Sequence, residues 1–253
     1  MFFALPDEYD SAGLFGVAHA CLLILSVLAI AVALYATRRC EESTVRRIIR
    51  IAAVVLWVLE LAKIAFVRCV VRTDNPNEYV PLYFCSITLY ALLLSSLRAP
   101  LLRRVGDCFL ATGGVVGGAV FLLCPITSLT RYPAWHFISL HSFLLHALMV
   151  YLGVCILLTN VYRPRLRDIL YYAGTVSVVC LVAFLYNTIY DKLHPSAPIA
   201  NLMFLSKDFP GIPISLAYRL LGPFYGPVAW LAQATLPFLV VFGICYRVGK
   251  ERV

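Results

Sequence analysis

Charged residues are scarce in this sequence. Asp, Glu, Lys and Arg make up 13% of the 253 residues, whereas about 25% is usual in soluble domains. Apolar residues take their place: 62% of the chain belongs to the set AVILMFWYC, and the mean hydropathy is +0.87. This composition excludes an ordinary soluble domain and is typical of a polytopic helical membrane protein.

Further absences narrow the class. The first ten residues contain no basic side chain and carry three acids, so we expect no cleaved signal peptide. Internal repeats, low-complexity segments and domain linkers are lacking, which predicts a single transmembrane domain over residues 1–253. The last apolar run has no lysine, which excludes a retinal-type receptor.

Seven apolar runs come close to the length that a helix needs to cross about 30 Å of hydrocarbon. We expect these spans at residues 14–36, 46–69, 81–97, 101–123, 134–158, 168–190 and 227–246. The predicted fold is therefore all-α, a transmembrane helical bundle.

Basic residues gather on one side of these spans. Fourteen of the 21 Lys and Arg residues lie within 38–50, 98–104, 163–167 and 247–252. Because basic residues collect in cytoplasmic loops, we expect the N-terminus outside and the C-terminus in the cytoplasm. The net charge of +8 then needs no nucleic-acid partner. We expect a multi-pass membrane protein, in the plasma membrane if it is bacterial.

Residues 191–226 differ from the short connections elsewhere. They contain apolar patches, Asn201 and prolines at 195, 198, 210, 213 and 223. This segment is too apolar for a solvated loop and too broken for a span. We expect an interfacial or re-entrant segment over the outer end of the bundle, because irregular backbone at membrane depth persists only where it is buried or lines a cavity.

Polar side chains within the spans are the main functional candidates, since each is costly unless it is paired or faces a cavity. Following the direction of each span places them in the outer half of the bundle: His19, Glu60, Lys63, Cys85, His136, His141, His146 and Asn187. The inner halves read as almost purely apolar, which favours a one-sided site. Structural roles stay open. Glu60 and Lys63 can neutralise each other on one helix face, and His19 and Asn187 can join helices by hydrogen bonds.

The three histidines of the fifth span, in WHFISLHSFLLH, lack the spacing of metal ligands. A step of five residues turns a helix by about 140°, so His136 and His141 point apart, as do His141 and His146. No Asp or Glu lies on this helix, and no H-x-x-x-H is present. We therefore expect no metal and no cofactor.

Most of the nine cysteines lie in apolar spans, where Cys behaves as a small hydrophobe. Cys69 and Cys124 fall at outer helix ends, and the question of a disulfide between them stays open.

Cys85 lies in VPLYFCSI, where Pro81 is expected to begin the third span. The thiol would then lie in the first turn or two of this helix, near the positive end of its dipole. An imidazole that takes the proton of such a thiol makes it a nucleophile, and His141 has a comparable depth. A packed Cys and a packed His are the alternative.

Several features together suggest a known family: P-L-x-x-C at the start of the third span, G-G-x-x-G-G in the fourth, the histidine-bearing fifth span and the outer segment after the sixth. In these features the chain resembles the YwaF-like integral membrane proteins, a group with a transmembrane ether-phospholipid acyltransferase that works through a Cys and a His. The resemblance implies that Cys85 is the nucleophile and His141 the base, with the assignment open by one or two turns. The glycines of the fourth span pack a neighbouring helix or leave a groove for an acyl chain.

Two functions follow. The first is a membrane lipid acyltransferase or acyl hydrolase whose partners are membrane lipids, a phospholipid acyl donor and a lysolipid acceptor. Its predicted catalytic residues are Cys85, His141 and His146, and its predicted substrate-binding residues are His19, Glu60, His136, Asn187 and Asn201. The second is a small-solute transporter or channel in which Glu60 and Lys63 line the pathway.

Overall fold

The computed structural model describes residues 2–3, 8, 10–205, 207–208 and 214–250. These residues form helices, turns and irregular connections, with no strand among them, which confirms the all-α fold. Most of the first ten residues, for which we predicted no cleaved signal, lie outside the described part of the chain. So do two of the prolines of the outer segment, at 210 and 213.

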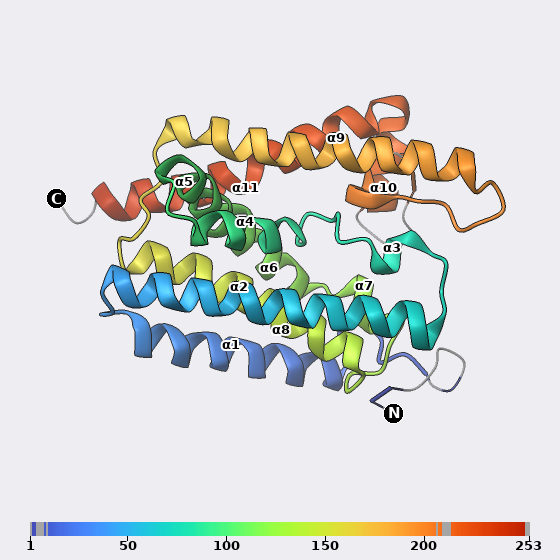
Figure 1. Cartoon of the computed structure of the whole chain (residues 1–253), viewed down its shortest axis with the longest axis horizontal. Coiled ribbons are helices and arrows are strands. Elements are labelled where there is room, and N and C mark those ends of the chain that lie inside the picture. Colours follow the sequence, from blue (N-terminus) through green and yellow to red (C-terminus); the bar gives the residue numbers. More distant parts are fainter. Residues whose placement is uncertain (1, 4–7, 9, 206, 209–213, 251–253) are drawn as a thin grey trace.

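Long helices run along the bundle and alternate in direction (Figure 1). These are α1 (Val17–Thr37), α2 (Glu42–Ala65) with the π-helical turn η2 (Phe66–Val71), α5 (Pro100–Phe109) continued through η3 (Leu110–Gly114) into α6 (Val115–Leu123), α8 (Phe137–Leu158), α9 (Ile169–Leu193) and α11 (Tyr225–Lys250). The shorter elements are α3 (Pro76–Tyr79), α4 (Ile87–Ser96), α7 (Ile126–Leu129), η4 (Leu166–Asp168), η5 (Leu202–Phe204), α10 (Ile214–Leu221) and η6 (Gly222–Phe224).

The core forms where these helices meet. Helix α8 packs against α1, α2 and α6, α4 packs against α2 and α5, and α9 packs against α11. Met149 and Leu152 of α8 are fully buried in this core, as is Tyr172 of α9. Large apolar side chains on the outer faces, such as Leu28 and Val178, are more than half exposed, as expected for surfaces that contact lipid.

Five helical stretches in the described residues are long and apolar enough to cross a membrane: Val17–Thr37, Pro100–Leu123, Phe137–Leu158, Leu166–Leu193 and Ile214–Val248. Helix α2 has 24 residues, about 36 Å, but six of its side chains are charged. Helix α4 has ten residues, about 15 Å, which is half of a hydrocarbon core of about 30 Å. The structure is thus a bundle of membrane type with five clear spans, fewer than the seven that we predicted.

The predicted third span, 81–97, is helical only in its second part. Residues 81–86 form irregular backbone and turns, and α4 begins at Ile87. The Pro81 carbonyl accepts a hydrogen bond from the Tyr90 hydroxyl at 3.2 Å, so a side chain takes the place of a helical partner. The prediction that Pro81 begins the helix is therefore wrong, and Cys85 lies in the turn that precedes α4.

The described residues of the outer segment 191–226 join short helical elements by irregular backbone, and some of them are buried. Leu202 and Met203 are fully buried. Their neighbours on α11 hold the backbone, since Gln233 donates to the Met203 carbonyl at 3.2 Å and the Tyr225 hydroxyl donates to the Phe204 carbonyl at 2.7 Å. Hydrogen bonds from side chains thus replace the regular helical bonds that this backbone lacks.

Glycines of the fourth predicted span lie where other groups come very close. A Cβ on Gly118 would lie 2.7 Å from the carbonyl oxygen of His146 on α8, and a Cβ on Gly117 would lie 2.9 Å from the ring of Phe84. These glycines let α6 approach α8 and let the residue before Cys85 pack on α6. Their packing role is therefore confirmed.

Candidate functional site

One end of the bundle holds most of the polar side chains that the sequence pointed to. Because the long helices alternate in direction, the starts of α1 and α8 and the ends of α2 and α9 lie together, on the right of Figure 1. His19, Glu60, His141 and Asn187 come from these four helix ends, and all four are buried. The turn with Cys85 leads into α4 from the same end.

Glu60 stands between two basic groups. Its carboxylate binds the Lys63 ammonium through Oε1 at 2.6 Å and faces Nε2 of His141 through Oε2 at 3.4 Å. Glu60 is only 1% exposed, whereas the Lys63 side chain is 18% exposed. A carboxylate buried this deeply persists only with charged or hydrogen-bonding partners, so the contacts to Lys63 and His141 are what keep it there.

Cys85 lies beside this charged cluster and is partly accessible. Its sulfur lies within electrostatic range of Lys63 and Glu60. His141 lies within electrostatic range of the same Lys63. Among the described residues, no hydrogen bond joins the thiol to an imidazole, so the approach of Cys85 to His141 stays a prediction.

All nine cysteines are free thiols, and Cys69 and Cys124 form no disulfide.

Thr88 is a member of this site that sequence reasoning missed. Its side chain is fully buried, and its hydroxyl has no hydrogen-bond partner among the residues that the structure describes. The Thr88 backbone N–H bonds to the Cys85 carbonyl at 3.1 Å, which is the three-residue step of a 3₁₀ turn. Side chains three residues apart eclipse in such a turn, so Thr88 shares a face with Cys85. The only signal in the sequence is that spacing.

The other histidines of α8 have different partners. Nδ1 of His146 contacts the Ser142 carbonyl oxygen at 2.6 Å, and its ring stacks on Phe121. His136 precedes the helix and caps it, since its Nδ1 accepts the Ile138 N–H at 3.1 Å. His141 is the histidine of this helix that contacts Glu60.

His19 uses both ring nitrogens in structural contacts. Nε2 lies 2.9 Å from the Leu122 carbonyl oxygen, and Nδ1 accepts the Phe15 N–H at 3.3 Å. The first contact joins α1 to the end of α6. Since Nδ1 accepts, Nε2 carries the proton and donates to that carbonyl.

The two asparagines fix the outer segment to the bundle. Asn187 pairs with the backbone of Leu202, donating to its carbonyl at 3.1 Å and accepting its N–H at 3.0 Å. The Asn201 N–H donates to the Asn77 side chain at 2.8 Å, and its Nδ2 donates to the Lys207 carbonyl at 3.0 Å. Within the described part of the chain, the buried Oδ1 of Asn201 has no hydrogen-bond partner. These contacts position the segment next to the start of the turn that carries Cys85.

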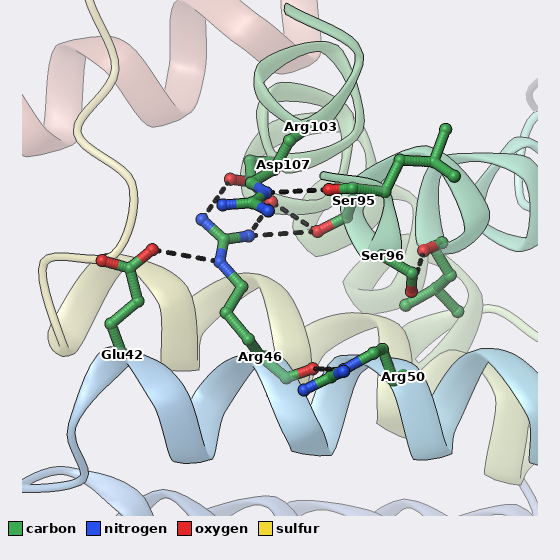
Figure 2. A network of polar contacts seen from close by, with 9 residues as sticks. Glu42, Arg46, Arg50, Ser95, Ser96, Arg103 and Asp107 are labelled. Carbon is green, nitrogen blue, oxygen red and sulfur yellow. Dashed lines mark hydrogen bonds and ion pairs between the residues drawn. The ribbon is translucent and has the colours of Figure 1, made fainter. Parts of the chain in front are cut away.

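The opposite end of the bundle holds a second buried charge cluster, drawn in Figure 2. Arg46 of α2 reaches between α4 and α5, where it binds both carboxylate oxygens of Asp107 at 2.7 and 2.8 Å. The Ser95 hydroxyl also donates to Asp107, and Glu42 binds Arg46 at its outer edge at 3.2 Å. Three helices are joined through one carboxylate.

Asp168 forms a similar junction nearby in the fold. It is fully buried and binds Arg104 of α5 at 2.9 and 2.6 Å. The Arg165 N–H and the Tyr162 hydroxyl donate to it at 2.9 and 3.0 Å. Burial raises the pKa of the Tyr162 phenol, which therefore keeps its proton and donates.

These two junctions correct one expectation. We predicted that the inner halves of the spans would be almost purely apolar, but Asp107 and Asp168 are buried there. Both lie near the ends of spans, where a sequence pattern predicts interfacial residues. Only the packing of the neighbouring helices shows that their side chains are buried. Every carboxylate oxygen has a partner, so the two junctions hold helices together and leave no oxygen free for a ligand.

Two grooves lie on the surface of the bundle, and neither is lined by the residues of the charged cluster. One, of about 380 Å³, runs between α9 and α11 and has Ser177 and Trp230 among mostly apolar lining residues. The other, of about 540 Å³, lies on α2 and has Arg47 and Arg50 among its lining residues. Neither of these two grooves reaches the cluster around Glu60, of which Cys85 is a partly accessible neighbour.

Comparison with known proteins gives one match. The TMEM164 family, a family of transmembrane proteins, matches residues 14–246, which include every helix that could cross a membrane except the last residues of α11. No curated protein and no solved structure matches the chain. The match spans most of the sequence and agrees with the apolar helical bundle. The chain belongs to the TMEM164 family.

Proposed function

We propose that this protein is a membrane acyltransferase or acyl hydrolase that acts on phospholipids, with Cys85 as nucleophile and His141 as base. The observation that carries the proposal is the group of Lys63, Glu60 and His141 beside the partly accessible thiol of Cys85. Ionisable groups gathered in a buried site around a nucleophilic side chain are typical of catalytic sites. The resemblance to the YwaF-like proteins, through P-L-x-x-C and the histidine span, supports the same pair.

The reaction would proceed in two balanced halves. The Cys85 sulfur attacks the ester carbonyl of a phospholipid while His141 takes the thiol proton, and the ester C–O bond breaks as the imidazolium returns that proton to the leaving lysolipid oxygen. A hydroxyl of a second lysolipid, or water, then attacks the thioester, gives its proton to His141 and releases the acyl group. The imidazolium reprotonates the sulfur.

The turn that carries the thiol also offers donors for the developing oxyanion. The backbone N–H groups of Cys85 and Ser86 belong to that turn, and the Thr88 hydroxyl has no partner among the described residues. Donors fixed in a site of low dielectric stabilise charge that appears in the transition state. In this proposal, Thr88 donates to the substrate carbonyl.

We further propose seven passes, with the N-terminus outside. Helix α2 and the turn with α4 would complete the five clear spans, and the basic residues at the other end would face the cytoplasm. The cluster of Glu60 would then open to the outer leaflet, and phospholipids and lysolipids of that leaflet would be its partners. The apolar groove between α9 and α11 is a surface on which an acyl chain can lie.

The test is a covalent intermediate. Purified protein incubated with a phospholipid that carries a labelled acyl chain is expected to hold the label as a thioester. Cys85→Ser should abolish the thioester, and His141→Ala should slow its formation by about 10²- to 10⁴-fold. Cys155→Ala, which removes a buried thiol of α8, serves as the control and should label normally. An unchanged thioester in Cys85→Ser would remove Cys85 from the mechanism.

A transporter is the second candidate, because a buried Glu60–Lys63 pair within a membrane bundle also suits an ion pathway. Polar groups at both ends of the bundle favour it. The full pairing of Asp107 and Asp168 speaks against it, since these groups leave no oxygen free for a passing solute. Solute uptake into vesicles that Glu60→Gln abolishes and Cys85→Ser leaves intact would establish the transporter.

A further inference from the structure

The carboxylate of Glu60 divides its two oxygens between two partners. Oε1 binds the Lys63 ammonium at 2.6 Å, and Oε2 faces the His141 ring at 3.4 Å. The second contact is long for a hydrogen bond, as such contacts often are in unliganded sites. Neither ring nitrogen of His141 makes a hydrogen bond to the described residues. The carboxylate contact is therefore the polar interaction that fixes which nitrogen carries the proton.

We propose that Glu60 is the positioning residue of the site: it holds the proton of His141 on Nε2 and leaves the lone pair of Nδ1 as the base for the Cys85 thiol. This inference rests on the proposed function and adds the residue that orients its base. Lys63 acts through Glu60, because its ammonium occupies the carboxylate oxygen that His141 does not use. A carboxylate accepts hydrogen bonds only, so it selects the Nε2–H tautomer.

The arrangement also solves a charge problem. Moving a proton from Cys85 to His141 turns two neutral groups into an ion pair, which is costly in an apolar bundle unless both charges have partners. The new imidazolium would face Glu60, and the new thiolate would lie within electrostatic range of the Lys63 ammonium. The net charge of the cluster stays constant throughout.

Other titratable groups face the cluster from the helices packed around it. Tyr90 of α4 lies within electrostatic range of Glu60, and His146 lies within range of His141 and Lys63. His146 has its Nδ1 engaged with the Ser142 carbonyl, which leaves it poorly placed to replace Glu60. None of these neighbours offers a second carboxylate to His141.

Glu60→Gln tests the proposal sharply. A glutamine side chain has one oxygen, and the Lys63 ammonium, which only donates, needs that oxygen as its acceptor. The amide NH₂ must then turn to Nε2 of His141 and force the ring proton onto Nδ1. The base is then lost although the shape of the site is kept. We expect the rate of Cys85 alkylation by iodoacetamide at pH 7, read on the Cys85 peptide by mass spectrometry, to fall on the order of 10²-fold. Glu60→Asp, which keeps the carboxylate, should recover part of this rate.

The pH profile separates positioning from a structural role. Alkylation of wild type and of Glu60→Gln should converge at high pH, where the thiol ionises without help. A purely structural ion pair would leave both the alkylation rate and the pH profile of the folded protein unchanged.

If Glu60→Gln fails to fold, Glu60→Gln combined with Lys63→Met removes both charges. In this double variant the amide oxygen of the glutamine is free to accept from His141, so we expect a Cys85 alkylation rate between those of wild type and Glu60→Gln. A wild-type rate in either variant would overturn the proposal.

Asp107→Asn is the matched control. It breaks a buried carboxylate pair on the same helix bundle, at the other end of α2, where Arg46 lies 14 residues or about 21 Å from Glu60. It should lower thermal stability and leave Cys85 alkylation unchanged. Alkylation needs no lipid, so the outcomes are separable. A rate that depends on Glu60 together with no thioester from phospholipid would uphold this inference and reject acyl transfer.

Discussion

At the scale of single residues, identical side chains acquire different roles from their partners. His136 caps α8, His146 bonds to a carbonyl of its own helix, and His141 faces a buried carboxylate. Glu60 is buried because both of its oxygens have basic partners. Thr88 stands out as the opposite case, since a fully buried hydroxyl without a partner costs free energy that folding does not recover.

Replacing Thr88 by Val is therefore expected to raise stability. Val keeps the shape and removes the unpaired hydroxyl, which should add about 1 kcal/mol to the free energy of unfolding. Thr112→Val is the matched control, because Thr112 is equally buried but its hydroxyl donates to the Cys108 carbonyl at 2.6 Å. That variant should lose stability. Thermal unfolding in one detergent measures both.

The same Thr88 variant also bears on the chemistry. If its hydroxyl donates to the substrate carbonyl, thioester formation should slow about tenfold while the protein becomes more stable. A gain in stability with an unchanged rate would make the hydroxyl a packing defect only. A loss of stability would contradict the absence of a partner.

At the scale of helices, close approach depends on the absence of side chains. Helix α6 meets α8 at Gly118, and Phe84 lies against Gly117. Phe84 immediately precedes Cys85 in the same turn. Its contact with Gly117 of α6 therefore helps to set where the thiol lies. Two buried carboxylates, Asp107 and Asp168, hold α2, α4, α5 and the start of α9 at the other end.

Gly118→Ala should reduce stability, since the new Cβ would lie 2.7 Å from a backbone oxygen of α8 that cannot rotate away. A loss of about 1–3 kcal/mol is expected. Gly174→Ala is the control, because a Cβ there meets nothing within 4 Å. That change should raise stability by about 0.5–1 kcal/mol through the better helix propensity of alanine. Equal unfolding temperatures would mean that α6 and α8 separate at little cost.

At the scale of the whole molecule, alternating helices bring distant parts of the chain to one end. Glu60 and His141 come from α2 and α8, Cys85 comes from the turn before α4, and the outer segment is fixed beside them by Asn187 and Asn201. The basic residues at the other end predict which side of the membrane this end faces. Under the proposed function, that orientation decides which leaflet supplies the substrate.

A topology experiment tests this orientation. A reporter that is active only in the cytoplasm should work when fused after Val253 and stay inactive when inserted after Ser196, an exposed turn residue that follows α9. Cytoplasmic activity at both positions would break the seven-pass arrangement. Activity at Ser196 alone would place the cluster of Glu60 at the inner leaflet.

Composition and periodicity alone determined that this chain is a helical membrane bundle, because 62% apolar residues in long runs leave few other folds in lipid. The direction of each span was also enough to bring Glu60, Cys85 and His141 to one end. The contact of Glu60 with His141 needed the tertiary structure, since the rotation of two separate helices about their axes is set by packing. So did the burial of Asp107 and Asp168. Residues near the ends of spans look alike in sequence, and only the neighbouring helices decide whether water or an arginine meets the carboxylate.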